Sequence, residues 1–344
     1  MWAITNKTPY AADGSWIQDK DANKFWMVVV KATFNVLPNG ETEPAEAQEP
    51  PLRSPRHYGE PGVSSLRYEA DLLGLKRRTD VLINGSAYAV AGRPVFSLDI
   101  RFTLGGIDKR LRIFGDRIWE RSVLGVARLS SPRPFDVMPI RYERSFGGWD
   151  RRAEDPREHR FEPRNPVGTG FARKEVNCIG LSAPNVEYPN QLIEFWRHRP
   201  TPAGLGAIEC HWSPRRELAG TFDERWRRER FPLWPNDFDA HYNNTAPIDQ
   251  QTARFLRGGE QVELVNLTPA GRLAFKLPRI YPFFVTKFGR ERVEHRGQLC
   301  TVLIEPDYPR VVLEWQTAVM CNHRVDELDS TTVTEKRWLQ PGSP

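Results

Sequence analysis

Residues 28–36 read Val-Val-Val-Lys-Ala-Thr-Phe-Asn-Val, and this stretch decides the fold class. Every even-numbered position from 28 to 36 is apolar, whereas the odd-numbered positions include Lys31, Thr33 and Asn35. A hydrophobic period of two is typical of a β-strand with one drier face, while a helix would repeat every 3.6 residues. The stretch therefore predicts a strand.

The same period recurs along the chain. Apolar residues alternate over 96–102, Gly105-Gly106 follows as a turn, and 110–114 returns as the next strand. Residues 262–267 and 273–277 flank a Pro-then-Gly turn, and 311–319 alternate once more. We expect a mainly β protein: one large antiparallel, β-sandwich-like domain over residues 1–344, with long ordered loops. The few helices expected are short, at 222–230, capped by Thr221, and at 247–256.

Composition excludes several classes of protein. The chain has 344 residues, of which 39% are hydrophobic and 11% aromatic, so it can close a sizeable core and is neither disordered nor collagenous. The longest apolar run, 25–30, is far shorter than the ~20 residues that a bilayer span needs. The first residues lack a basic segment followed by an apolar one, so we expect a cytoplasmic protein without a membrane partner.

The charge pattern argues against nucleic acid as a partner. The formal net charge is +5, but residues 215–230 mix six arginines with four acids. A groove that tracks phosphates needs basic charge gathered on one face. Arginine supplies 39 of the 49 basic residues, and together with 11 Trp this suits a surface that binds proteins. A genome-wide bias toward arginine codons would produce the same skew.

Two clusters have residue types that chemistry could use. Asp237, Asp239 and His241 would lie on one face of an extended segment and could hold a metal ion, although loop amides or arginines would equally occupy the two carboxylates. Cys210-His211 places a thiol beside an imidazole, but neighbours on a strand point to opposite faces. We expect the four cysteines to be reduced core residues, because no two form a Cys-x-x-Cys pair.

A series of loop motifs resembles a known family. The series includes His57-Tyr58-Gly59-Glu60-Pro61, Arg144-Ser145-Phe146-Gly147-Gly148 and Glu162-Pro163-Arg164-Asn165-Pro166-Val167-Gly168, and it ends with Asp237-Phe238-Asp239 and Gly258-Gly259-Glu260. In order and number these blocks closely resemble the family catalogued as domain of unknown function 2169. The best-matching part is 31–277, and 278–344 match more loosely. The motif residues are Gly59, Glu60, Pro61, Phe146, Gly147, Gly148, Glu162, Pro163, Arg164, Asn165, Pro166, Gly168, Asp237 and Asp239.

The resemblance implies a role in the bacterial type VI secretion system. Members look like cytoplasmic adaptors or chaperones that help a toxin effector load onto a VgrG-type spike. The resemblance transfers no catalytic residue, cofactor or metal, so we expect a non-enzymatic protein. The alternative is a metal-dependent hydrolase or nuclease that uses Asp237, Asp239 and His241.

Within this expectation, two features of the loops carry specific predictions. Trp226, Arg228 and Trp234 are the predicted partner-binding residues, since Trp and Arg dominate interface hot spots. The aromatic residues could also stack bases, or simply pack a short helix onto the sheet. Residues 141–150 and 162–168 are predicted to be ordered loops, braced by buried pairs of arginine and carboxylate.

Overall fold

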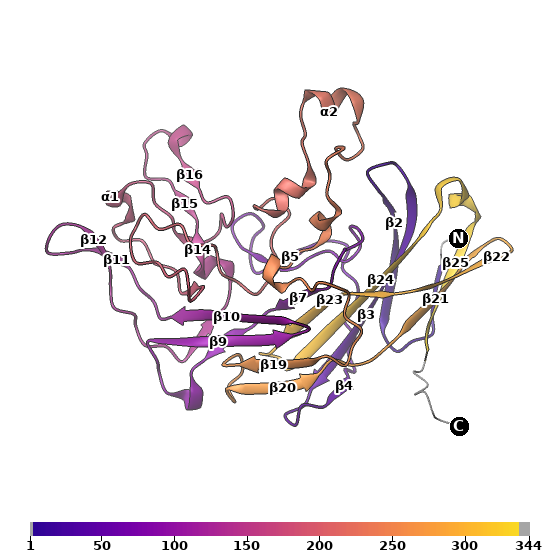
Figure 1. The fold of residues 1–344 in the computed structure, drawn as a ribbon, viewed down its shortest axis with the longest axis horizontal. Helices are drawn as coiled ribbons and strands as arrows, with labels where there is room; N and C mark the ends of the chain where they lie inside the picture. Colours follow the sequence, from indigo (N-terminus) through magenta and orange to yellow (C-terminus); the bar gives the residue numbers. More distant parts are fainter. Residues whose placement is uncertain (1–2, 337–344) are drawn as a thin grey trace.

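Three β-sheets form the body of the molecule in this computed structural model, which describes residues 3–336 (Figure 1). The largest sheet has the order β2 (Ala11–Gln18), β3 (Lys24–Val36), β24 (Arg310–Met320), β23 (Gln298–Glu305), β7 (Asp80–Ile83), and β4 (Thr42–Pro44) also pairs with β3. The second has the order β18 (Val186–Glu187), β10 (Ile107–Phe114), β9 (Ser97–Leu104), β19 (Gln261–Val265), β20 (Arg272–Lys276). The third has the order β1 (Ala3–Asn6), β25 (Leu328–Glu335), β21 (Pro282–Phe288), β22 (Glu291–Arg296). Residues 1–2 and 337–344 of the predicted domain lie outside the described residues.

One hydrophobic cluster joins the three sheets. It contains Val28 and Val30 of the first sheet, Phe102 of the second and Phe284 of the third, and none of these side chains is more than 2% exposed. The prediction of a mainly β protein is therefore confirmed. Two pairings within the large sheets, β7 with β23 and β1 with β25, are parallel, which the expected antiparallel arrangement did not include.

The C-terminal strands belong to the centre of the fold. β24 pairs with β3 along its whole length, from Arg310 opposite Asn35 to Met320 opposite Phe25. Strands β23 and β24, from the part expected to match the family more loosely, thus complete the largest sheet.

Strand β3 differs from the sequence prediction in one respect, because both of its faces are buried. Val28 and Val30 face the main core, whereas Met27 and Val29 pack with Leu72 on the other side. Lys31 is also buried, and its Nζ lies 2.8 Å from Oδ2 of Asp71. The expected wet face is covered by the loop that follows β4 and leads to β7.

Short β-pairs and helices connect the sheets. The pairs are β5 (Arg56–His57) with β6 (Leu66–Tyr68), β8 (Ser86–Tyr88) with β13 (Val137–Pro139), β11 (Trp119–Arg121) with β12 (Ala127–Leu129), β14 (Phe146–Gly147) with β17 (Thr169–Gly170), and β15 (Trp149–Asp150) with β16 (Arg160–Phe161). The α-helices are α1 (Glu175–Cys178) and α2 (Glu224–Glu229). Short 3-10 helices lie at Val90–Gly92, Tyr142–Arg144, Pro156–Glu158, Arg215–Ala219, Ala240–Asn243, Ile248–Gln250 and Asn322–Glu327. None of the helices within residues 3–336 has the length and apolar character needed to cross a bilayer.

The second predicted helix, 247–256, is wrong. Only Ile248–Gln250 is helical there, and the chain then runs extended beside β7, where Gln251 forms a bridge with Asp80. The fully buried side-chain amide of Gln250 donates to the carbonyls of Val81 at 2.7 Å and Leu205 at 2.9 Å. These hydrogen bonds hold the segment against the sheet edge, so tertiary contacts override the local helical pattern.

Candidate functional site

Residues 220–243 form an arm that projects from the body, with α2 at its tip (Figure 1). Its two legs are tied together near their base. The amide and hydroxyl of Thr221 donate to Oδ1 and Oδ2 of Asp237 at 3.0 and 2.7 Å, and the amide of Asp239 donates to the carbonyl of Leu218 at 2.9 Å. Because Thr221 is used in this way, it does not cap the helix.

Helix α2 starts at Glu224 and not at residue 222, because Asp223 is its N-cap. Oδ1 of Asp223 accepts a hydrogen bond from the amide of Trp226 at 2.7 Å. Such a cap satisfies one of the amides that lack a partner in the first turn. The predicted helix is therefore confirmed in place, and the prediction of Thr221 as its cap is wrong.

An aromatic cluster holds the arm together. Ring centroids are 4.8 Å apart for Phe222 and Trp226, and 4.6 Å apart for Trp234 and Phe238. The indole Nε1 of Trp226 donates to the carbonyl of Leu233 at 2.9 Å, which links the helix to the returning leg. The six members are Phe222, Trp226, Phe231, Trp234, Phe238 and Tyr242. The arm is thus stiffened by its own contacts and does not need α2 to pack on a sheet.

The solvent-facing part of this cluster consists of two phenylalanines. Phe231 is 69% exposed and Phe222 is 52% exposed, whereas the predicted Trp226 and Trp234 are half-buried. The third predicted residue, Arg228, is exposed, and its side chain has no ion pair or hydrogen bond within residues 3–336, although Arg225 and Arg227 each pair with a glutamate of α2. Phe222 was missed as a surface residue because it lies before the N-cap of α2, where no period along the chain indicates its exposure.

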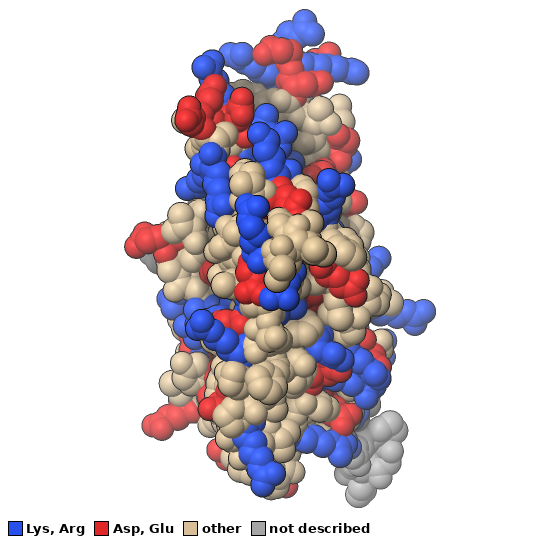
Figure 2. All heavy atoms as spheres, turned by 90° about the vertical axis from the view of Figure 1, so that its left-hand side faces the viewer, with Lys and Arg blue, Asp and Glu red and all other residues tan. Residues whose placement is uncertain are grey.

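The charges around the arm are mixed in sign. Figure 2 shows acidic and basic side chains interspersed over the face at the left of Figure 1, including the arm at its top. Shape and apolar contact, more than a single-sign field, would therefore select a partner for this arm.

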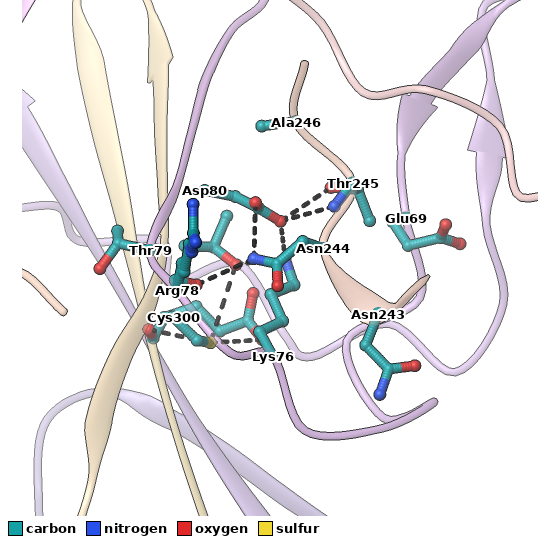
Figure 3. Close-up of polar contacts among 12 residues, drawn as sticks. Glu69, Lys76, Arg78, Thr79, Asp80, Asn243, Asn244, Thr245, Ala246 and Cys300 are labelled. Carbon is teal, nitrogen blue, oxygen red and sulfur yellow. Dashed lines mark hydrogen bonds and ion pairs between the residues drawn. The ribbon is translucent and has the colours of Figure 1, made fainter. Parts of the chain in front are cut away.

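The arm's returning leg is anchored to the body through the buried carboxylate of Asp80 on β7 (Figure 3). Oδ1 accepts a hydrogen bond from Nδ2 of Asn244 at 2.9 Å, and Oδ2 accepts one from the amide of Thr245 at 2.8 Å. Nζ of Lys76 lies 3.0 Å from Oδ2. These contacts fix the exit of the arm on the edge of the largest sheet.

The anchor belongs to a larger buried set of charges, with a cavity of about 30 Å³ beside it. Burial alone would lower the pKa of Lys76, but the charges of Asp80 and Glu314 outweigh it and raise that pKa. Burial, followed by repulsion from Asp71, raises the pKa of Glu314 to about 7, against the attraction of Lys76 and Lys31.

The predicted metal cluster does not converge in the described structure. Both oxygens of Asp237 accept from Thr221, and Oδ1 of Asp239 accepts from the amide of His241 at 2.9 Å. These hydrogen bonds lower the pKa of both carboxyl groups. Within residues 3–336, a set of potential metal ligands that does come together is formed instead by Glu209, Cys210 and His211.

The family motifs mainly shape loops. Nε of Arg164 donates to Oε1 of Glu162 at 2.7 Å and NH2 donates to Oε2 at 2.8 Å, as the bracing hypothesis expects for residues 162–168. Glu162 is buried, while the Arg164 side chain remains 32% exposed. Nδ2 of Asn165 donates to the carbonyls of Tyr142 and Phe146, at 2.8 and 3.0 Å.

The other predicted loop, 141–150, is braced by different partners. The buried carboxylate of Asp150 accepts hydrogen bonds from Nδ2 of Asn177 and the amide of Arg173. The carboxylate of the half-buried Glu143 accepts from the amide and hydroxyl of Ser65. Amides and a hydroxyl thus replace the expected arginines. Two motif glycines lie where another backbone segment passes too close for a side chain. A Cβ at Gly147 would lie 2.1 Å from the carbonyl oxygen of Asn165, and one at Gly148 would lie 2.3 Å from that of Gly168. Both residues also have positive φ, +154° and +91°.

In the first motif, the side chain of Ser64 closes the turn. Its Oγ accepts from the amide of Gly59 at 3.0 Å and donates to the carbonyl of Glu60 at 2.8 Å, while Pro61 bridges to Ser64. Pro163 accepts a hydrogen bond from the amide of Ser213, which connects the third motif to the base of the arm. The motif residues that lie on the arm itself are Asp237 and Asp239.

Comparison with known proteins gives one match. The family model described as an uncharacterized protein conserved in bacteria (DUF2169) matches residues 21–316. The match includes β3, the arm and most of β24. Neither a curated protein nor a solved structure matches the chain.

Proposed function

Because the chain belongs to the DUF2169 family of uncharacterized proteins conserved in bacteria, we propose that it is a non-enzymatic, cytoplasmic adaptor of the type VI secretion system. It binds a toxin effector and helps to load it onto a VgrG-type spike. The loop motifs described above motivate the choice of this secretion system, through the family that they resemble.

The projecting arm is the observation that carries the proposal. Two exposed phenylalanines, Phe222 and Phe231, lie on a segment stiffened by its own aromatic cluster and anchored through Asp80. A rigid apolar projection loses little conformational entropy on binding, which favours affinity. Unpaired Arg228 adds a donor beside it for a partner's carboxylate or carbonyl.

Such a surface suits an adaptor that holds a folded cargo and later releases it. A standard protein interface buries ~1,200–2,000 Å², of which a few aromatic and arginine side chains provide most of the binding energy. The arm supplies side chains of this kind at its tip, and the neighbouring body supplies the remaining area. The paired carboxylates of Asp237 and Asp239 stabilise the arm in this proposal and take no part in chemistry.

The test is co-purification of the effector encoded beside this gene. Phe222→Ala and Phe231→Ala together are expected to weaken the complex at least ~10-fold, since each truncation removes an apolar anchor. Phe96→Ala is the matched control, because Phe96 is 62% exposed on the body, immediately before β9 and outside the arm. Deletion of the gene should lower effector delivery while the secretion tube still fires.

Two results would overturn the proposal. One is effector abundance and delivery that do not change on deletion of the gene. The other is metal-dependent turnover by the purified protein that Asp239→Ala abolishes, which would establish the hydrolase or nuclease alternative.

A further inference from the structure

A tight turn precedes the arm and carries an unusual set of side chains. The amide of Trp212 donates to the carbonyl of Glu209 at 3.1 Å, so Cys210 and His211 occupy the two central positions of a four-residue turn. The expectation that these two residues lie on a strand and point apart is therefore wrong. The turn brings potential ligand atoms of Glu209, Cys210 and His211 within 4.8 Å of one another.

The carboxylate in this set is buried, and an imidazole lies beside it. Glu209 is 6% exposed, and its Oε1 is shielded from solvent. Nε2 of His57 lies 2.6 Å from that oxygen, and Nδ1 of His211 lies 3.9 Å from Oε2. A buried carboxylate gains from a nearby cation.

We propose that Glu209, Cys210 and His211 form a binding site for a divalent metal ion of the zinc class, with His57 positioning the carboxylate. The donors are one oxygen, one sulfur and one imidazole nitrogen, a combination that Zn²⁺ accepts and that hard cations such as Mg²⁺ and Ca²⁺ do not favour. Water completes the fourth position. On binding, the thiol releases its proton to solvent and the thiolate forms the metal–sulfur bond.

The geometry needs only side-chain movement to reach coordination. Metal–ligand bonds of about 2.0–2.3 Å place the donor atoms around a tetrahedral zinc ion roughly 3.3–3.8 Å apart. In the structure the three potential ligand atoms lie within 4.8 Å of one another. Cys210 and His211 are exposed, so their χ angles are free to close that gap. The less mobile ligand is Glu209, which His57 already holds from the side of β5.

The position of the site gives the ion a structural role. Cys210 neighbours Tyr242, the member of the aromatic cluster at the base of the arm. Nε of Arg215, four residues after His211, donates to the carbonyl of Tyr242 at 2.8 Å. A metal ion on the turn would therefore fasten the arm's base to β5, which carries His57. This inference stands on the isolated chain and does not depend on any effector.

Thiol accessibility provides the first measurement. Cys178, Cys300 and Cys321 are buried, as expected, but the expectation of a core position is wrong for Cys210, which is exposed on the turn. A thiol reagent applied to the native, metal-free protein is expected to modify one sulfur, and one equivalent of Zn²⁺ is expected to protect it. Titration with Co²⁺ should produce a thiolate charge-transfer band in the near ultraviolet that saturates at one ion per chain.

Substitutions then assign the ligands. Cys210→Ser should remove the band, and His211→Gln should lower the affinity for Co²⁺ at least ~10-fold. His57→Gln should lower it less, as expected for a residue that orients a ligand. His241→Gln is the matched control. Like His57 and His211, His241 has its imidazole near a carboxylate, here that of Asp239 at 2.8 Å, but this carboxylate is exposed and lies outside the proposed site.

The outcome that supports the proposal is loss of binding with Cys210→Ser and unchanged binding with His241→Gln. The proposal is overturned if Zn²⁺ fails to protect Cys210, or if His241→Gln removes binding that Cys210→Ser retains. Neither result bears on effector binding, which is measured with different variants.

Discussion

Replacing Asp80 by Asn should lower the stability of the protein by breaking the buried ion pair at the arm's anchor. The substitution keeps the size of the side chain and removes its charge. Lys76, with a side chain only 9% exposed, then loses the carboxylate that lies 3.0 Å from its Nζ. The new amide group also presents donors to Nδ2 of Asn244 and the amide of Thr245, which are donors themselves.

The magnitude follows from the burial of both partners. Breaking a buried ion pair on one side costs about 3–5 kcal/mol, because an uncompensated charge is left behind. Unfolding entropy of about 2.1 cal/mol/K per residue amounts to roughly 0.7 kcal/mol/K for 344 residues. The melting temperature should therefore fall by about 4–7 °C.

Urea unfolding and calorimetry measure both quantities. The matched control is Asp108→Asn, since Asp108 also pairs with a basic side chain, Arg101 at 2.6 Å, but on the surface. An exposed pair contributes about 0–1 kcal/mol. In a third variant, Asp80→Asn combined with Lys76→Met, both charges are removed, and it should be more stable than Asp80→Asn alone.

Two results would refute this reasoning. In one, Asp80→Asn is as stable as the control, so the pair is solvated and not buried. In the other, the double variant loses the sum of the two single effects, so the charges act independently and Lys76 does not depend on Asp80.

Three further predictions concern single residues. The raised pKa of Glu314, about 7, means that the folded state binds more protons than the unfolded state; stability should therefore fall by about 3 kcal/mol as pH rises from about 4.5 to 7, and Glu314→Gln should flatten that part of a urea-unfolding pH profile. Arg164→Ala should cost about 1–3 kcal/mol by urea unfolding, because the buried carboxylate of Glu162 loses two charge-assisted hydrogen bonds; an unchanged midpoint would show that solvent replaces the guanidinium. Gly148→Ala should destabilise the protein more than Gly62→Ala in a thermal melt. Both glycines have positive φ, but a Cβ at 148 would lie 2.3 Å from the carbonyl oxygen of Gly168, whereas at 62 none of the described atoms outside the local chain lies within 4 Å. Equal losses of stability would assign the cost to backbone strain alone.

The candidate site was predictable only in part. Sequence reasoning predicted the short helix and named Trp226, Arg228 and Trp234 as partner-binding residues, but it did not predict that this segment projects from the body as an arm. It could not tell that the two tryptophans are half-buried while Phe222 and Phe231 are exposed. Three of these four aromatic residues lie outside α2. Their exposure depends on how the two legs of the arm pack together, and that packing leaves no periodic signal in the sequence.

The strands, by contrast, were determined locally. Strand β3 is indicated by the period of two at 28–36, and the hairpins β9–β10 and β19–β20 by the turns at Gly105-Gly106 and Thr268–Gly271. These signals involve only residues close in the chain, so the strands could be predicted directly from the sequence. Hairpins of this kind need no information from distant residues.

Tertiary structure decided what covers those strands and what their side chains meet. Lys31 reads as a solvent-facing position until a loop brings Asp71 to 2.8 Å from it. The segment 247–256 reads as a helix until Gln250 donates to carbonyls on two other segments. The potential ligand atoms of Glu209, Cys210 and His211 lie close together only because the chain reverses at this turn. Each of these outcomes depends on contacts between residues far apart in the chain or on a backbone reversal, and a period along the chain records neither.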